Sequence, residues 1–250
     1  METELILALS ALLAGAMNSI AGGGTLLTFP ALARVIGEAS ANATSTLALL
    51  PGSLAGAWGY RREVAASRRF VLLMLAPSLI GGALGAWLVT RDQDTFTILV
   101  PWLILTAAVL FLIQQPVSRW MRMHKPDREP RRLGKTLLIL AQLLIAIYGG
   151  YFGAGIGILM LTALGFMGVG DIHRMNGIKT VLAAVINGAS VGVFLFDQTL
   201  IHWHYAGVMA VAAVLGGYVG ARLARRLPAS VVRLMVIAIG FGLAIYYFAK

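Results

Sequence analysis

Long apolar runs separated by short polar segments dominate this chain. Those of membrane-crossing length cover residues 70–89, 96–113, 205–221 and 231–248. A helix needs about 20 apolar residues to cross a bilayer, whereas a transmembrane β-barrel would show shorter segments of alternating hydrophobicity. The pattern therefore predicts an all-α, polytopic membrane protein.

Two further apolar stretches are interrupted by glycine clusters. The glycines are Gly22, Gly23 and Gly24 in the first stretch and Gly153, Gly155 and Gly157 in the second. The short apolar segments that flank them are residues 5–20 and 26–36, and residues 137–148 and 158–167. Each glycine inside a helix costs roughly 1 kcal/mol relative to alanine. Non-helical backbone at membrane depth is tolerated only where it is buried in protein or lines a cavity. Paired interruptions of this kind therefore predict two hairpins of short helices around a transporter's binding site.

The order of segments in residues 1–115 is repeated in residues 136–250. Each half has a glycine-broken hairpin followed by three longer helices, and the second of these carries a Gly-Gly-x-x-Gly cluster, beginning at Gly81 and at Gly216. Such small-residue faces let helices pack closely. They could do so within one chain or between two, so a homodimer stays open. Residues 116–135 form a linker between the two repeats.

The distribution of charge predicts how the halves are oriented. The chain is 59% hydrophobic and carries a net charge of +10. Sixteen of its twenty Lys and Arg residues fall on one side when the spans alternate, which is the positive-inside pattern and does not indicate nucleic-acid binding. The first half then starts outside and the second starts inside. We therefore expect two inverted repeats in the inner (cytoplasmic) membrane, with both termini extracytoplasmic.

Seven of those basic residues lie in the linker. They are Arg119, Arg122, Lys125, Arg128, Arg131, Arg132 and Lys135. A cluster of this size next to a span is typical of segments that contact anionic lipid headgroups, and it also serves as a plain topological anchor.

Polar residues follow one face of the first longer helix in each half, over residues 39–58 and 175–196. Four matched pairs lie 134 positions apart: Asn42 with Asn176, Ser45 with Lys179, Thr46 with Thr180, and Ser53 with Asn187. At about 100° per residue they share one side of each helix. Single Ser or Thr residues in membrane helices often serve only as interhelical hydrogen-bonding groups. Four matched pairs instead favour a shared polar cavity.

Lys179 is the one charged member of this face. An ionisable residue within a span is costly and marks a candidate functional site. The alternative is that its side chain reaches the cytoplasmic surface near Arg174 and is only an anchor.

The chemistry of these positions favours a small anion. Helix N-termini at the glycine breaks would offer backbone N–H groups and a favourable dipole, and Asn18 and Thr25 could add donors. No carboxylate accompanies them. Cysteine is absent and no metal-ligand or catalytic set is apparent, so neither a cofactor nor an enzyme is predicted. A passive anion channel and a non-transporting, lipid-binding scaffold remain alternatives to a transporter.

Several stretches resemble one known family. They are AGAMNSIAGGGTLLTFPAL, ASANATSTLALLPGSLAGAWGYRREV, HRMNGIKTVLAAVINGASVGVF and GGYVGARLARRLP. Together they are similar to the TauE/SafE family of sulfite exporters and sulfonate permeases. The resemblance implies an inverted-repeat transporter of sulfite, organosulfonates or related anions. It places the translocation site at Asn18, at residues 22–25 and 42–46, and at residues 176–187. The second cluster, GAGIG, departs from a triple glycine.

Overall fold

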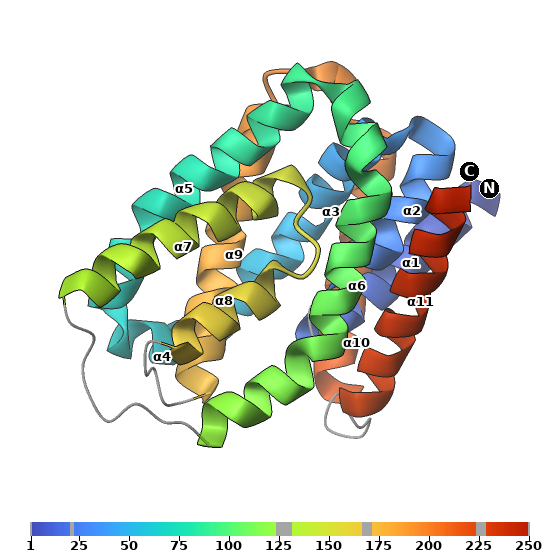
Figure 1. Ribbon diagram of the computed structural model, residues 1–250. Coiled ribbons are helices and arrows are strands. Elements are labelled where there is room, and N and C mark those ends of the chain that lie inside the picture. Colours follow the sequence, from blue (N-terminus) through green and yellow to red (C-terminus); the bar gives the residue numbers. More distant parts are fainter. Residues whose placement is uncertain (1, 21–22, 124–131, 167–171, 224–228, 250) are drawn as a thin grey trace.

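The computed structural model describes residues 2–20, 23–123, 132–166, 172–223 and 229–249, which contain helices and no strand (Figure 1). The first half holds α1 (Glu2–Ile20), α2 (Thr25–Ile36), α3 (Glu38–Gly59), α4 (Arg61–Ala66), α5 (Arg68–Arg91) and α6 (Gln93–Met123). The second half holds α7 (Arg132–Tyr151), α8 (Ile156–Phe166), α9 (Ile172–Phe194), the 3-10 turn η1 (Gln198–Leu200), α10 (Trp203–Leu223) and α11 (Ala229–Ala249). The prediction of an all-helical protein is confirmed for these residues.

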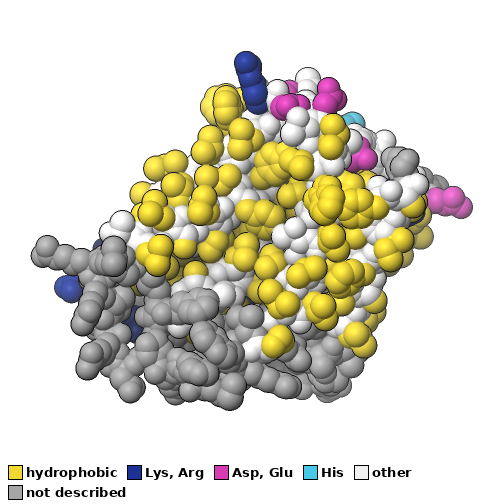
Figure 2. All heavy atoms as spheres, viewed as in Figure 1, with side chains coloured by type: hydrophobic (Ala, Val, Ile, Leu, Met, Phe, Trp, Pro, Cys, Tyr) yellow, Lys and Arg dark blue, Asp and Glu magenta, His cyan; other side chains and the backbone are white. Residues whose placement is uncertain are grey.

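Three helices in the described part of the chain are long and apolar enough to cross a membrane, with spans at Arg68–Arg91, Gln93–Ile113 and Arg174–Phe194. Several shorter apolar helices accompany them, including Thr25–Ile36 and Ile156–Gly165 on either side of the centre. Figure 2 shows a broad hydrophobic surface across the middle of the molecule, with acidic side chains gathered at its upper end. This distribution is that of a membrane-embedded protein.

Each broken hairpin packs mainly against the other half of the chain. Helix α1 lies along α10, and α7 lies along α5. Helix α3 likewise contacts α10, while α9 contacts α5. Helices α3 and α9 meet at the centre, and α6 packs on α11 at one side. The two halves therefore interlock and do not form separate bodies.

The small-residue faces bring these helices together within one chain. A Cβ placed on Gly216 of α10 would collide with the carbonyl oxygen of Leu12 in α1. In the other pair, a Cβ on Gly85 of α5 would collide with the carbonyl oxygen of Ile147 in α7. The predicted close approach is confirmed at both places, because only a hydrogen atom fits at these contacts.

The glycine clusters end one helix and begin the next. Gly23, Gly153 and Gly155 have φ angles of 88°, 82° and 81°, in the left-handed region that favours glycine. The first break lies directly before α2, and the second lies between Tyr151 and Ile156. The predicted breaks are therefore present in both halves, and the helices that follow them, α2 and α8, are short. The helices that precede them are longer than predicted, with 19 residues in α1 and 20 in α7.

Two segments differ from the sequence-based expectation. The basic segment after α3, where the sequence predicts a loop, forms the short helix α4. Helix α6 continues through Pro116 to Met123, so the first part of the predicted linker is helical. Residues 124–131 of the linker lie outside the described residues, and residues 132–135 belong to α7. Basic and polar side chains can extend a helix beyond the apolar core, which hydropathy alone does not reveal.

A polar cavity between the broken helices

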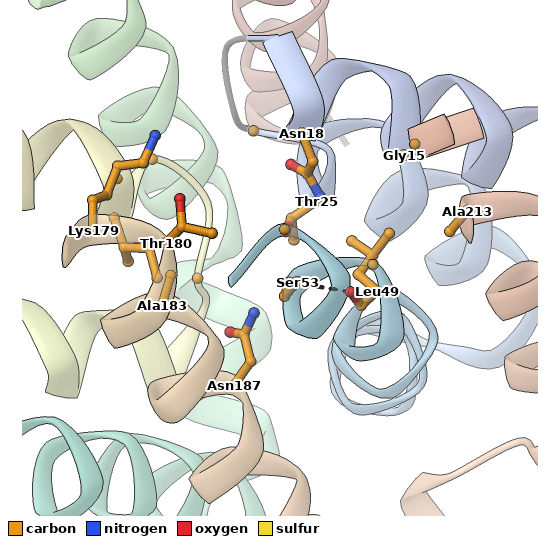
Figure 3. Close-up of a pocket in the computed structure, with 18 of the residues that line it drawn as sticks. Gly15, Asn18, Thr25, Leu49, Ser53, Lys179, Thr180, Ala183, Asn187 and Ala213 are labelled. Atoms are coloured by element: carbon orange, nitrogen blue, oxygen red, sulfur yellow. Dashed lines mark hydrogen bonds between the residues drawn. The ribbon is translucent and has the colours of Figure 1, made fainter. Parts of the chain in front are cut away.

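A cavity of about 170 Å³ lies between the two glycine breaks. Its walls come from α1, α3, α6, α9 and α10, and from the breaks that precede α2 and α8. Water occupies about 30 Å³ per molecule in the liquid, so the space suits a small ion with little accompanying water. Figure 3 shows Asn18 and Thr25 on one side of the cavity and Lys179, Thr180 and Asn187 on the opposite side.

Both breaks contribute the N-terminus of a short helix to the wall. Gly23 and Thr25 line the cavity where α2 begins, and residues 155–158 line it where α8 begins. Some of the first N–H groups are already engaged, since that of Leu26 donates to the Gly23 carbonyl and that of Ile158 to the Gly155 carbonyl. The helix dipole adds partial positive charge at each N-terminus. Two helix N-termini at one cavity therefore favour an anion.

Asn18 fixes the geometry of the first break. Its Oδ1 accepts a hydrogen bond from the backbone N–H of Gly24 at 2.8 Å. This bond ties the end of α1 to the start of α2 across the interruption. The side chain also lines the cavity, so Asn18 has both a structural contact and access to the space.

Lys179 lines the cavity, as the site interpretation of this residue requires. Its aliphatic chain runs over Gly157 in α8, where an added Cβ would lie 3.1 Å from the Lys179 Cδ. No described residue forms an ion pair with it. No carboxylate lines the cavity among the residues that the structure describes. The ammonium group therefore has no counter-charge at the cavity.

The hydroxyl and amide groups on α3 and α9 differ in what they can offer. Thr180 donates its hydroxyl to the Asn176 carbonyl at 2.8 Å, and Ser53 donates to the Leu49 carbonyl at 3.1 Å. Their protons are therefore engaged. The Asn187 amide has no hydrogen-bond partner among the described residues and lines the cavity. Asn187 and Lys179 are thus the donors available on α9.

Some predicted site residues lie away from the cavity. Ser45 is fully buried and shares a hydrogen bond with Thr28 of α2 at 2.6 Å, which is the interhelical role considered above. The buried Asn42 donates from Nδ2 to the Tyr151 carbonyl at 3.0 Å. The predicted residues outside the cavity wall are Gly24, Asn42, Ser45, Thr46 and Asn176. Gly22 lies outside the described residues. Of the predicted residues, those in the wall are Asn18, Gly23, Thr25, Gly153, Gly155, Lys179, Thr180 and Asn187.

Other wall residues were not among the predicted set. Gly15 and Gly217 reach the cavity from the α1–α10 contact, and Phe111 reaches it from α6. The glycine spacing in α10 is the only sequence signal for such a contact, and it does not indicate that a cavity borders it. Among the described residues, no group of three or more His, Cys, Asp or Glu side chains could hold a metal ion.

A helical membrane protein whose broken helices enclose a cationic, carboxylate-free cavity belongs, by fold and site, with membrane transporters. The sequence model of the family described as "Sulfite exporter TauE/SafE" matches residues 7–247. The chain belongs to this family.

Its curated relatives carry transporter names. A "Probable membrane transporter protein" of Haemophilus influenzae is 28% identical over 90% of this chain and 86% of that protein. The "Probable membrane transporter protein YfcA" of Escherichia coli K12 is 29% identical over 92% of this chain and 83% of that protein. The "Probable membrane transporter protein ORF9" of a Sinorhizobium species is 29% identical over 94% and 88% of the two chains. The chain is therefore a membrane transporter by family, and these names do not specify a substrate.

Proposed function

We propose that this protein is a secondary transporter that moves a small sulfur-containing anion, such as sulfite or an organosulfonate, across the cytoplasmic membrane by alternating access. The observation that carries the proposal is the cavity in which Lys179 and two helix N-termini meet without a carboxylate. A cation site would instead need acidic side chains or bare carbonyls. The sulfur chemistry follows the family description.

The packing of the helices supports an inverted-repeat mechanism. The contact between α1 and α10 has its counterpart in the contact between α7 and α5. The contact of α3 with α10 corresponds in the same way to that of α9 with α5. Two repeats related by an axis in the membrane plane would produce such exchanged pairs, and rocking of one against the other would expose a central site to either side.

The charges at the two ends support the orientation. Arg61 and Arg68 flank the short helix α4, and Arg174 lies in the first turn of α9 at the same end of the bundle, where its Nε donates to Ser67 at 2.6 Å. The opposite end carries Glu4, hydrogen-bonded to His204, and Asp197. By the positive-inside rule we assign the arginine end to the cytoplasm and both termini to the outside.

Counterflow in proteoliposomes tests this function. Vesicles are preloaded in turn with sulfite, a short alkyl sulfonate, sulfate and a carboxylate of similar size, and uptake of a radiolabelled trace is measured. A transporter of sulfur anions exchanges the first two selectively. A channel would pass ions without counterflow and would give single-channel currents in a planar bilayer. A scaffold would give neither signal, and that result would refute the proposal.

A further inference from the structure

The cavity occupies only part of the length of the two central helices. On α3 its wall runs from Leu49 to Gly56, in the half nearer Arg61. On α9 its wall runs from Lys179 to Asn187, across the middle of the helix. In the orientation given above, the α3 segment lies toward the cytoplasm and the α9 segment lies at mid-depth, so the cavity extends from the centre of the protein toward the cytoplasm. The structure is therefore in an inward-facing arrangement.

The other end of these helices is closed by a set of buried contacts, which we call the outer closure. It consists of the Asn42–Tyr151 and Thr28–Ser45 hydrogen bonds and the packed phenylalanine rings of Phe29 and Phe152. The Phe29 and Phe152 rings meet edge to face at 5.2 Å, and both are fully buried. This closure joins α2 and α3 of the first half to the second glycine break.

One polar atom in the outer closure has no partner. The Oδ1 of Asn42 is buried without a hydrogen bond, although Nδ2 of the same amide donates to Tyr151. A buried acceptor that loses its water destabilises the arrangement that contains it. Opening the closure would return water to this atom. At Asn42 the hydrogen bond to Tyr151 therefore favours the closed arrangement, whereas the unpaired Oδ1 disfavours it.

The repeat shows which residues would line the pathway after it opens to the other side. In an inverted-repeat transporter, each half takes up the conformation of the other when the protein changes sides. Shifting the α3 wall by 134 positions gives Ala183, Ile186, Asn187 and Ser190 on α9. Shifting the α9 wall back gives Ser45, Thr46, Leu49 and Ser53 on α3.

Four residues belong to the wall before and after this exchange. They are Leu49, Ser53, Ala183 and Asn187. Ser53 and Asn187 are the polar members and are each other's counterparts in the repeat. We propose that Ser53 and Asn187 form the central anion-binding pair in both orientations, with the Ser53 hydroxyl turning from the Leu49 carbonyl to the anion when the anion binds. Lys179 and Thr180 then line only the cytoplasmic access, and Ser45 and Thr46 only the opposite access. This inference rests on the inverted-repeat transporter proposed above.

The two accesses differ in charge as a consequence. The counterpart of Lys179 is Ser45, so a cation faces the anion on the cytoplasmic side and a hydroxyl faces it on the other. The same pairing explains why Ser45 is buried here although it lies on the polar face of α3. Ser45 is buried because the outer closure covers it, and not because of its position on α3.

The chain contains no cysteine, so single cysteines report accessibility without background. Ser45→Cys, Ser53→Cys and Thr180→Cys are labelled with a membrane-impermeant maleimide, separately in right-side-out and inside-out vesicles. Phe196→Cys and Arg61→Cys, both highly exposed at opposite ends, verify the sidedness of the vesicles. In the present arrangement, positions 53 and 180 should react from the cytoplasmic side only, and position 45 from neither side.

Opening of the outer closure is then forced by mutation. Asn42→Ala removes the bond to Tyr151, and Phe152→Ala removes ring packing should the first variant fail to fold. Asn42→Ala should raise labelling at positions 45 and 53 from outside by up to about tenfold, the shift in population that the loss of one good hydrogen bond produces. Phe152→Ala should raise the same labelling through the loss of ring packing. Labelling at position 180 should fall.

The possible results separate the inference from the proposed function. The inference is supported if the variants raise labelling of position 45 from outside and lower labelling of position 180 from the cytoplasmic side, while position 53 reacts from each side in turn. This result would support it whatever anion is transported. Position 45 remaining unlabelled from outside in both folded variants would overturn it. So would labelling of position 180 from outside, which would indicate a continuous channel. A failure of counterflow with sulfur anions would refute the proposed substrate and leave the labelling pattern unaffected.

Discussion

The contact between α1 and α10 allows a sharp test, because two glycines of α10 differ only in their surroundings. An added Cβ at Gly216 would lie 2.6 Å from the Leu12 carbonyl carbon, whereas none of the surrounding atoms comes within 4 Å at Gly207. Ordinary contact begins near 3.4 Å, so the two helices must separate locally by more than about 0.8 Å to admit the methyl group, because the Leu12 carbonyl oxygen lies closer still. Forced overpacking of this kind typically costs about 1–3 kcal/mol.

Gly216→Ala should therefore lower the free energy of unfolding, while Gly207→Ala should leave it unchanged or raise it. Alanine at an open helical position gains up to about 1 kcal/mol over glycine. Thermal unfolding of the purified protein in detergent, followed by tryptophan fluorescence, measures both variants under one condition. Equal melting temperatures for the two alanine variants would refute the packing described for α1 and α10.

Three further predictions concern the first glycine break, the lysine and an exposed helix cap. Asn18→Asp keeps an acceptor for the Gly24 N–H but adds a negative charge to the cavity. The affinity for an anion should therefore fall by at least about tenfold while the melting temperature is retained. An unchanged affinity would contradict an anion site. Gly157→Ala displaces the Lys179 side chain by a few tenths of an ångström and should weaken anion binding several-fold. Gly192→Ala, at a glycine with open space around it, should leave binding unchanged. Equal anion binding by the two variants would show that the Gly157–Lys179 contact is not part of the site. At Asp92, hydrogen bonds from the Thr95 hydroxyl and N–H hold the pKa of the carboxyl below its ordinary value. The ionised carboxylate therefore stabilises the fold at pH values above the ordinary pKa, and this stabilisation is lost as the pH falls through the lowered pKa. Asp92→Asn should therefore make the melting temperature less sensitive to pH below about pH 4, and an unaltered profile would show that this cap carries no charge effect.

The helices themselves could be predicted from the sequence because apolar runs and glycine clusters act locally. Glycines at positive φ are the places where the chain must leave the helix, and the pattern placed both breaks correctly within a few residues. Whether the basic segments form helices was less predictable. The α4 helix and the end of α6 lie beyond the apolar runs, where hydropathy carries no information about helix content.

The candidate site was predictable in chemistry but not in extent. On α9, Lys179, Thr180 and Asn187 of the predicted polar face line the cavity, whereas on α3 only Ser53 does. Sequence periodicity could not show that the cavity ends near Leu49 and leaves Asn42 and Ser45 buried. That limit depends on tertiary contacts between α2, α3 and the second break, which link residues more than a hundred positions apart.

Binding of radiolabelled sulfite, and of a short alkyl sulfonate, to the purified protein tests the central claim most directly. The measurement compares the unaltered protein with Lys179→Gln, which removes the cavity's cation, and with Arg34→Gln, which removes a charge stacked on Tyr246 away from the cavity. We expect saturable binding to the unaltered protein and to Arg34→Gln, and binding at least about tenfold weaker in folded Lys179→Gln, which has lost the attraction of the cation. Equal binding by both variants, or no saturable binding of either anion to the unaltered protein, would contradict it.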